Sequence, residues 1–200
     1  MGLVLAVANQ KGGVGKTVTA INLSYTLATL EERVLLLDLD PQGNATFGLG
    51  LNPDALEGKT TFDVLMSEAG MVELGIHDTA HAQLKLIPSN VDLAGAEVHL
   101  TRDLVGGTVQ LRRALQPIQG AFDFIVIDCP PSLGILTLNA LMAATDLLIP
   151  IQTHTYALKG MKDLMVTVKR AYGVDVRRAE LAGVTIGGLV DRILAGASGR

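Results

Sequence analysis

The amino-acid sequence predicts an α/β protein with a doubly wound, mostly parallel sheet and helices on both of its faces. Three observations support this fold class. The chain has 200 residues, 48% of them hydrophobic, so it can bury a sizeable core. Its 22 glycines and 4% aromatic content are typical of neither a disulfide scaffold nor a disordered chain. Short apolar runs also alternate with segments of helical spacing along the chain.

The expected strands are apolar runs that are too short for helices. Several are continuously apolar, which is typical of strands buried on both faces. They lie at 3–8, 34–40, 84–88, 124–128, 147–151 and 181–186. The expected helices lie between them, at 15–30, 60–68, 92–100, 107–116, 134–144 and 157–172. This alternation predicts right-handed crossovers and a ligand site outside the carboxyl ends of the strands.

The chain is expected to form a single domain over residues 1–200, since no internal repeat or long linker divides it. Residues 40–58 form its one long Gly-rich connection. A long loop that leaves the end of a strand is often functional.

The first strand is followed by GGVGKT, residues 12–17, at a strand-to-helix junction. Its glycines let successive main-chain N–H groups surround phosphate oxygens, and the positive end of the following helix favours an anion. Lys16 is expected on the β- and γ-phosphates and the Thr17 hydroxyl on Mg²⁺. The residues predicted to bind the nucleotide are Gly12, Gly13, Val14, Gly15, Lys16, Thr17 and Val18. The alternative is a merely flexible loop.

A second lysine, Lys11, precedes this loop, where the usual phosphate-loop pattern has no such charge. Its ammonium can point away from its own nucleotide and be offered to a phosphate bound by a second subunit. The alternative from the residues alone is a solvated surface lysine.

Acidic residues follow two further strands. Asp38 and Asp40 lie two apart at a strand end, where Asp40 can orient a water for in-line attack on the γ-phosphate. Asp128 ends another buried strand, and a carboxylate in that place is presented to Mg²⁺ directly or through water. The alternatives are that the first pair caps a turn and that Asp128 caps the following segment.

These motifs resemble those of one family. KGGVGKT matches the deviant Walker A motif of the ParA/MinD superfamily of P-loop NTPases, and DLDPQGN, IDCPPS and IPIQTHTYALKGM resemble ParA/Soj-type partitioning ATPases. The resemblance implies an ATPase with ATP and Mg²⁺ as cofactors. The resemblance also implies that Lys11 reaches the nucleotide of the partner subunit. It implies that Asp40 is required for hydrolysis and that Asp38 is a supporting carboxylate. It also implies a homodimer formed with ATP, non-specific binding of double-stranded DNA and slow turnover stimulated by a ParB-type partner.

The C-terminal part departs from the family pattern, because members usually continue for several tens of residues beyond the strand expected at 181–186. We therefore expect the chain to lack the family's C-terminal segment, which leaves purine and DNA contacts unassigned. Residues 159–200 are nevertheless rich in Lys and Arg, a weak indication of a polyanion partner.

Two other functions remain open. One is a membrane-associated positioning ATPase like MinD. The DPQGN motif argues against this function. The other is a metabolic or redox enzyme of the same fold. An iron protein like that of nitrogenase would need cluster cysteines, and this chain has one cysteine. No apolar run reaches the roughly 18 residues of a membrane span, so a cytoplasmic protein without a membrane partner is expected. The resemblance to ParA/Soj-type ATPases implies that it associates with the nucleoid.

Overall fold

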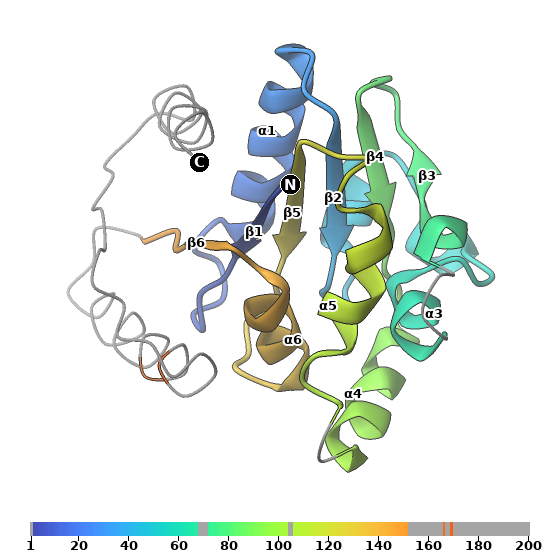
Figure 1. The fold of residues 1–200 in the computed structure, drawn as a ribbon, viewed down its shortest axis with the longest axis vertical. Coiled ribbons are helices and arrows are strands. Elements are labelled where there is room, and N and C mark those ends of the chain that lie inside the picture. The colour runs from blue at the N-terminus through green and yellow to red at the C-terminus, as the bar shows by residue number, and fades with distance from the viewer. Residues whose placement is uncertain (1, 68–71, 104–105, 152–165, 167–168, 170–200) are drawn as a thin grey trace.

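The computed structural model describes residues 2–67, 72–103, 106–151, 166 and 169. Its centre is a six-stranded sheet with the strand order β3-β4-β2-β5-β1-β6 (Figure 1). The strands are β1 (Leu3–Val7), β2 (Val34–Asp38), β3 (His77–Asp78), β4 (Leu84–Ile87), β5 (Phe124–Asp128) and β6 (Asp146–Leu148).

All the strand pairs of this sheet are parallel except one. β5 lies between β2 and β1, and β4 and β6 continue the parallel arrangement on either side. β3 pairs antiparallel with β4 at the edge. β1, β2 and β5 are buried along their whole length, as their continuously apolar sequences predict. The carboxyl ends of these three adjacent strands therefore lie side by side at the same end of the sheet.

Helices cover both faces of the sheet. They are α1 (Lys16–Thr29), α2 (Asn44–Gly48), α3 (Thr61–Met66), α4 (Leu93–Arg102), α5 (Gln110–Leu115) and α6 (Ile135–Ala143). Short 3-10 turns lie at Pro53–Ala55, Val72–Gly75 and Gln116–Ile118. α1 and α2 pack on one face, whereas α3 to α6 pack on the other. The arrangement is the doubly wound one, with α5 and α6 in front of the sheet in Figure 1.

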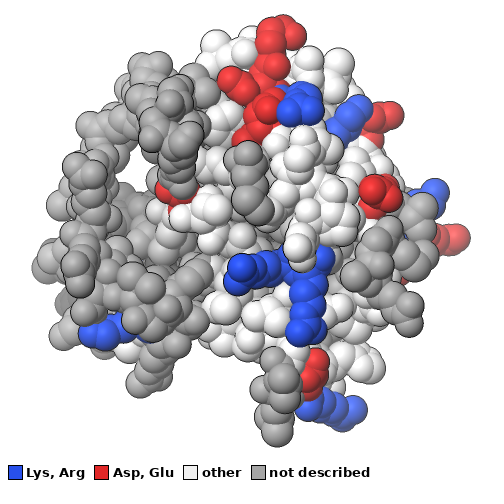
Figure 2. All heavy atoms as spheres, viewed as in Figure 1, with Lys and Arg blue, Asp and Glu red and all other residues white. Residues whose placement is uncertain are grey.

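Uncharged residues make up most of the described surface on the face that carries α5 and α6, and the charged groups form small separate clusters (Figure 2). Within the described ranges, no helix combines the length and the apolar character that crossing a membrane requires.

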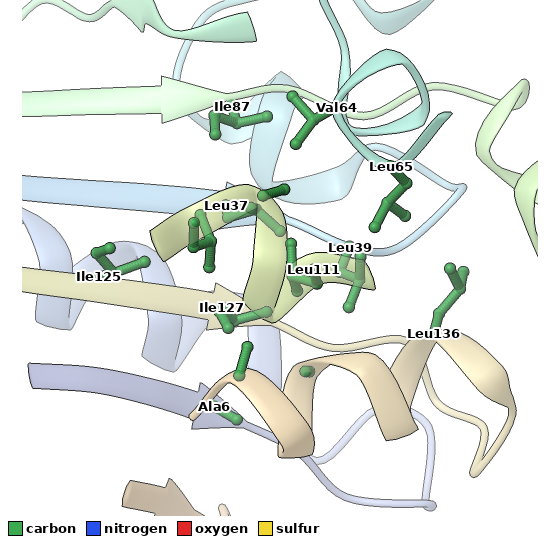
Figure 3. Close-up of a cluster of buried hydrophobic side chains, with 14 of the residues drawn as sticks. Ala6, Leu37, Leu39, Val64, Leu65, Ile87, Leu111, Ile125, Ile127 and Leu136 are labelled. Atoms are coloured by element: carbon green, nitrogen blue, oxygen red, sulfur yellow. The ribbon is translucent and has the colours of Figure 1, made fainter. Parts of the chain in front are cut away.

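The larger of the two cores lies between the sheet and α3 to α6. Figure 3 shows Leu37, Ile125 and Ile127 of the central strands pointing toward Leu111 of α5. Each of these side chains is fully buried. Burial of one such side chain stabilises a fold by roughly 1.5–3 kcal/mol, so this layer holds the central strands, and with them the strand ends, firmly in register.

The predicted fold class is confirmed, but its elements differ in detail. The predicted connection at 40–58 contains α2 and a 3-10 turn, and the helix predicted at 107–116 begins only at Gln110. β3 was not predicted. The helix expected at 157–172 and the strand expected at 181–186 lie outside the described residues, apart from helical positions at 166 and 169.

Candidate nucleotide site

The predicted site residues come together because three neighbouring strands end at the same level. In the sheet register Asp128 of β5 lies opposite Val7 of β1 on one side and Asp38 of β2 on the other. The loop after β1 and the turn after β2 therefore flank Asp128. Segments that are as many as about 120 positions apart in the sequence are therefore neighbours at the carboxyl ends of these strands.

The loop between β1 and α1 has the backbone of a phosphate loop. Gly13 and Gly15 have positive φ angles of 72° and 89°, a conformation that other residues rarely adopt. A Cβ atom added at either position would have no neighbour within 4 Å, so the space beside both residues is open. Gly15 caps α1, which begins at Lys16, and the first N–H groups of the helix are therefore available to an anion.

Lys16 is the buried cation of the site. Its side chain is 6% exposed, and its Nζ donates to the main-chain oxygen of Lys11 at 3.2 Å. Burial lowers the pKa of Lys16, while the charges of Asp128 and Asp40 oppose this shift. The ammonium thus lies close to two carboxylates.

Asp128 is the carboxylate of the site whose surroundings best fit a metal ligand. It is 0% exposed, and neither of its side-chain oxygens has a hydrogen-bond partner in the described part of the chain. Burial raises its pKa to about 7 and the charge of Asp38 adds to this shift, whereas the neighbouring hydroxyl of Thr17 opposes it. A buried carboxylate without partners is costly, and a hydroxyl next to a carboxylate is a ligand set that Mg²⁺ accepts. These residues therefore fit a magnesium ion.

Asp40 and Asp38 belong to the turn that follows β2. Asp40 is 8% exposed, and its Oδ1 accepts a hydrogen bond from the main-chain N–H of Gln42 at 3.0 Å. Asp38 is fully buried, and burial raises its pKa to about 6 despite the hydrogen bonds it accepts from Thr46. Asp40 is thus the more accessible of the two.

Lys11 differs from the other predicted residues. It is exposed, and its side chain forms no ion pair within the ranges that the structure covers. Its main chain is well held, since its N–H donates to Oδ1 of Asn9 at 3.0 Å. Nδ2 of the same Asn9 donates to the oxygen of Pro150 at 2.8 Å. Asn9 is a part of the site that sequence reasoning missed, although a polar residue directly after a buried strand was a signal for it.

Gly12 and Val18 lie at the two ends of the segment predicted to bind the nucleotide. Gly12 lies beside the Pro130-Pro131 turn, because a Cβ atom added to it would be 4.0 Å from Cβ of Pro131. Val18 lies in the first turn of α1 with a side chain that is 62% exposed. Binding of a nucleotide by these residues stays a prediction.

Comparison with known proteins gives the same motifs a family context. Residues 2–178 match the family model described as "AAA domain". The chain is 46% identical over 186 residues to the chromosome partitioning protein ParA of Caulobacter vibrioides, covering 92% of this chain and 68% of that protein. It is 46% identical over 169 residues to the sporulation initiation inhibitor protein Soj of Bacillus subtilis, covering 84% of this chain and 66% of that protein.

Solved structures give a similar result. The chain is 43% identical to a cobyrinic acid a,c-diamide synthase from Mycobacterium smegmatis with bound ADP and magnesium, with a TM-score of 0.80 over 88% of this chain and 70% of that chain. It is 26% identical to a plasmid partition protein from Borrelia burgdorferi, with a TM-score of 0.73 over 86% and 74% of the two chains. The chain spans 58% to 66% of the length of several curated relatives.

Proposed function

Because the chain belongs to the ParA/Soj family of partitioning ATPases, we propose that it is an ATP-dependent dimerising switch for DNA segregation. The observation that carries this proposal is the pair of unpartnered Asp128 oxygens beside Thr17 and the ammonium of Lys16. A buried carboxylate of this kind is what a nucleotide-bound magnesium ion needs, and it lies at the end of β5, opposite the last residue of the strand that leads into the phosphate loop.

ATP and Mg²⁺ are the proposed cofactors. The main-chain N–H groups of residues 12–18 and the ammonium of Lys16 would hold the phosphates, while Thr17 and Asp128 would hold the metal, Asp128 directly or through water. When bound, the metal neutralises phosphate charge. Lys16, which now donates to the Lys11 main-chain oxygen, would hold phosphate oxygens instead, and their negative charge would offset the cost of burying its ammonium.

Asp40 is the proposed catalytic carboxylate. It is 8% exposed, in contrast to the fully buried Asp38, and its turn is held by main-chain hydrogen bonds, including one from Gly43 N–H to the Asp40 oxygen at 3.0 Å. A fixed carboxylate can orient a water molecule toward the γ-phosphate, and positioning of this kind supplies most of the catalysis in phosphoryl transfer. The products would be ADP and phosphate.

Lys11 is the proposed contact between two subunits. Its exposed side chain is anchored at the backbone by Asn9, so it can extend away from its own loop toward a second nucleotide. ATP would thereby join two copies, and the homodimer would bind double-stranded DNA without sequence preference until hydrolysis separates it. A ParB-type, DNA-bound partner would stimulate that slow hydrolysis, and the protein would act in the cytoplasm on the nucleoid.

A metabolic enzyme of the same fold is the second candidate, and one observation favours it. The Mycobacterium smegmatis structure at 43% identity carries the name of a cobyrinic acid a,c-diamide synthase. This function would use the same phosphate loop but would not require a DNA-bound dimer. ATP-dependent amide formation on cobyrinic acid, without ATP-dependent binding to DNA, would therefore favour the second candidate over the first.

The first test of the proposal measures nucleotide binding and ATP hydrolysis in variants of the site. Lys16→Ala should abolish binding of a fluorescent ATP analogue, because the loop loses its ammonium. Asp40→Ala should bind the analogue as the wild type does but should turn over ATP at least about 100-fold more slowly, the loss typical of a missing positioning group. Lys85→Ala is a matched control, since Lys85 is paired with Asp78 at the far edge of the sheet.

Two results would contradict the proposal. Undiminished nucleotide affinity in Lys16→Ala would remove the loop from the site. Wild-type turnover in Asp40→Ala would remove this carboxylate from the reaction.

A further inference from the structure

A buried polar network lies directly behind Asp40, at the carboxyl ends of β2 and β4. Its centre is the carboxylate of Asp38, which is 0% exposed. Thr46, the third residue of α2, is also 0% exposed and donates to Asp38 Oδ2 twice, from its N–H at 2.8 Å and from its hydroxyl at 2.7 Å. The main-chain N–H of Asp40 donates to Asp38 Oδ1 at 3.1 Å. One carboxylate therefore joins the first and last parts of the turn that carries Asp40.

The hydroxyl of Thr46 is itself fixed from the other side. The main-chain N–H of Ser89, just after β4, donates to Thr46 Oγ1 at 2.8 Å. Since the oxygen accepts this bond, its proton is directed at Asp38. The network therefore runs from the end of β4 through Thr46 and Asp38 to the backbone of Asp40.

No cation of the described residues pairs with Asp38, so its orientation depends on these hydrogen bonds. A buried carboxylate that loses a donor turns or shifts to regain one. Any turn of this carboxylate displaces the N–H of Asp40, and catalytic efficiency is sensitive to displacements of about 1 Å.

We propose that Thr46 is a positioning residue for hydrolysis, which holds Asp40 in place through the carboxylate of Asp38. This inference rests on the proposed function, because it presumes that Asp40 acts on ATP. It assigns to α2, which lies in the long connection after β2, the task of fixing the catalytic turn. Thr46 touches neither nucleotide nor water in this role.

The test replaces Thr46 with valine, which has the same shape but no hydroxyl, and with serine, which keeps the hydroxyl. Single-turnover hydrolysis, affinity for an ATP analogue and thermal unfolding are measured in the intact protein. Thr46→Val should hydrolyse ATP at least about tenfold more slowly and bind the analogue within about twofold of the wild type, as expected when positioning alone is lost. Thr46→Ser should restore most of the rate.

Thr61→Val is the matched control. Thr61 is equally buried, but its one hydroxyl proton is shared between the main-chain oxygens of Asp38 at 2.7 Å and Pro88 at 3.1 Å and is not directed at the carboxylate. It should lower the melting temperature about as much as Thr46→Val does and leave the hydrolysis rate within about twofold, because the carboxylate keeps its donors.

Asp38→Asn gives a second route to the same answer if Thr46→Val folds poorly. It should slow hydrolysis by a similar factor on its own. If Thr46→Val does fold, the double variant should be no slower than either single variant, since both act through one group. Wild-type hydrolysis in Thr46→Val, or equal rate losses in Thr46→Val and Thr61→Val, would overturn the positioning role alone. A wild-type protein that binds no ATP or never hydrolyses it would overturn the proposed function as well.

Discussion

At the scale of single residues, the site concentrates negative charge. Asp40 and Asp128 lie near one buried ammonium, that of Lys16, and Asp38 lies near Asp128. Burial raises the pKa of Asp128 to about 7 and that of Asp38 to about 6. The nucleotide-free protein therefore keeps an electrostatic strain at neutral pH, which a bound divalent cation would relieve.

This strain predicts the direction of pH dependence. Both carboxyls have a higher pKa in the folded chain than the roughly 4 of an unfolded one, so the folded state binds more protons between about pH 4 and pH 7. The free energy of unfolding should then fall as pH rises through that window.

Asp128→Asn imitates the protonated form of the carboxyl at every pH. Without metal, the stability of this variant relative to the wild type should grow by about 2–3 kcal/mol between pH 5 and pH 8, because only the wild type ionises there. Urea unfolding with a chelator present measures the difference. Parallel pH curves for the two proteins would show that Asp128 is not the strained group.

The site residues that could be predicted are charged residues in motifs at the carboxyl ends of buried strands. Asp128 ends β5, Asp40 lies in the turn after β2, and Lys16 begins the helix that follows the loop after β1. Parallel strands bring these carboxyl ends together. Asn9 and Thr46 could not be assigned roles, because their partners Pro150 and Ser89 are 141 and 43 positions away. A sequence pattern records spacing along the chain and carries no information on such contacts.

At the scale of elements, hydrophobic periodicity predicted the long helices and central strands but missed the short pieces. α2 has five residues and begins after Gly43, inside a segment whose glycines are typical of a loop. β3 has two residues and a partly exposed pattern, so it has neither length nor alternation to reveal it. Their positions are set by tertiary contacts, such as the Thr46 network, and not by local propensity.

Gly43 shows how tightly the turn before α2 is built. Its φ is 63°, and an added Cβ atom would lie 2.8 Å from Cγ of Pro53 and 2.9 Å from the oxygen of Ser89. Gly43→Ala should therefore combine a strained backbone with a clash and lower the free energy of unfolding by about 3 kcal/mol or more.

Gly58→Ala is the control for this prediction. Gly58 has a similar φ of 74°, but nothing lies within 4 Å of an added Cβ atom. Its cost should be the backbone strain alone, about 1–2 kcal/mol. Urea unfolding of both variants measures the difference, and equal losses would mean that the turn relaxes without cost.

At the scale of the whole molecule, charge is the constraint on the proposed DNA partner. The chain has a formal net charge of −4, and the described face in Figure 2 has no continuous basic surface. A net negative charge opposes a polyanion, so DNA binding depends on locally basic parts of the surface. Two copies joined by ATP would double the basic surface available to one DNA molecule. Each contact with a DNA phosphate releases condensed counterions, so the affinity should depend on salt in proportion to the number of contacts.

With ATP, the protein should sediment as a dimer and carry duplex DNA with it; with ADP or no nucleotide it should do neither. Raising salt from 50 to 200 mM should weaken the DNA affinity at least about tenfold, since even a few phosphate contacts give such a dependence.

Lys11→Ala separates nucleotide binding from dimer formation and DNA binding. It should still bind the ATP analogue through Lys16 and the loop amides, yet it should remain a monomer and leave DNA in the supernatant, because the cation that reaches the second nucleotide is gone. DNA binding by this monomeric variant, or binding by the wild type that is indifferent to nucleotide and salt, would mean that dimer formation does not create the DNA surface.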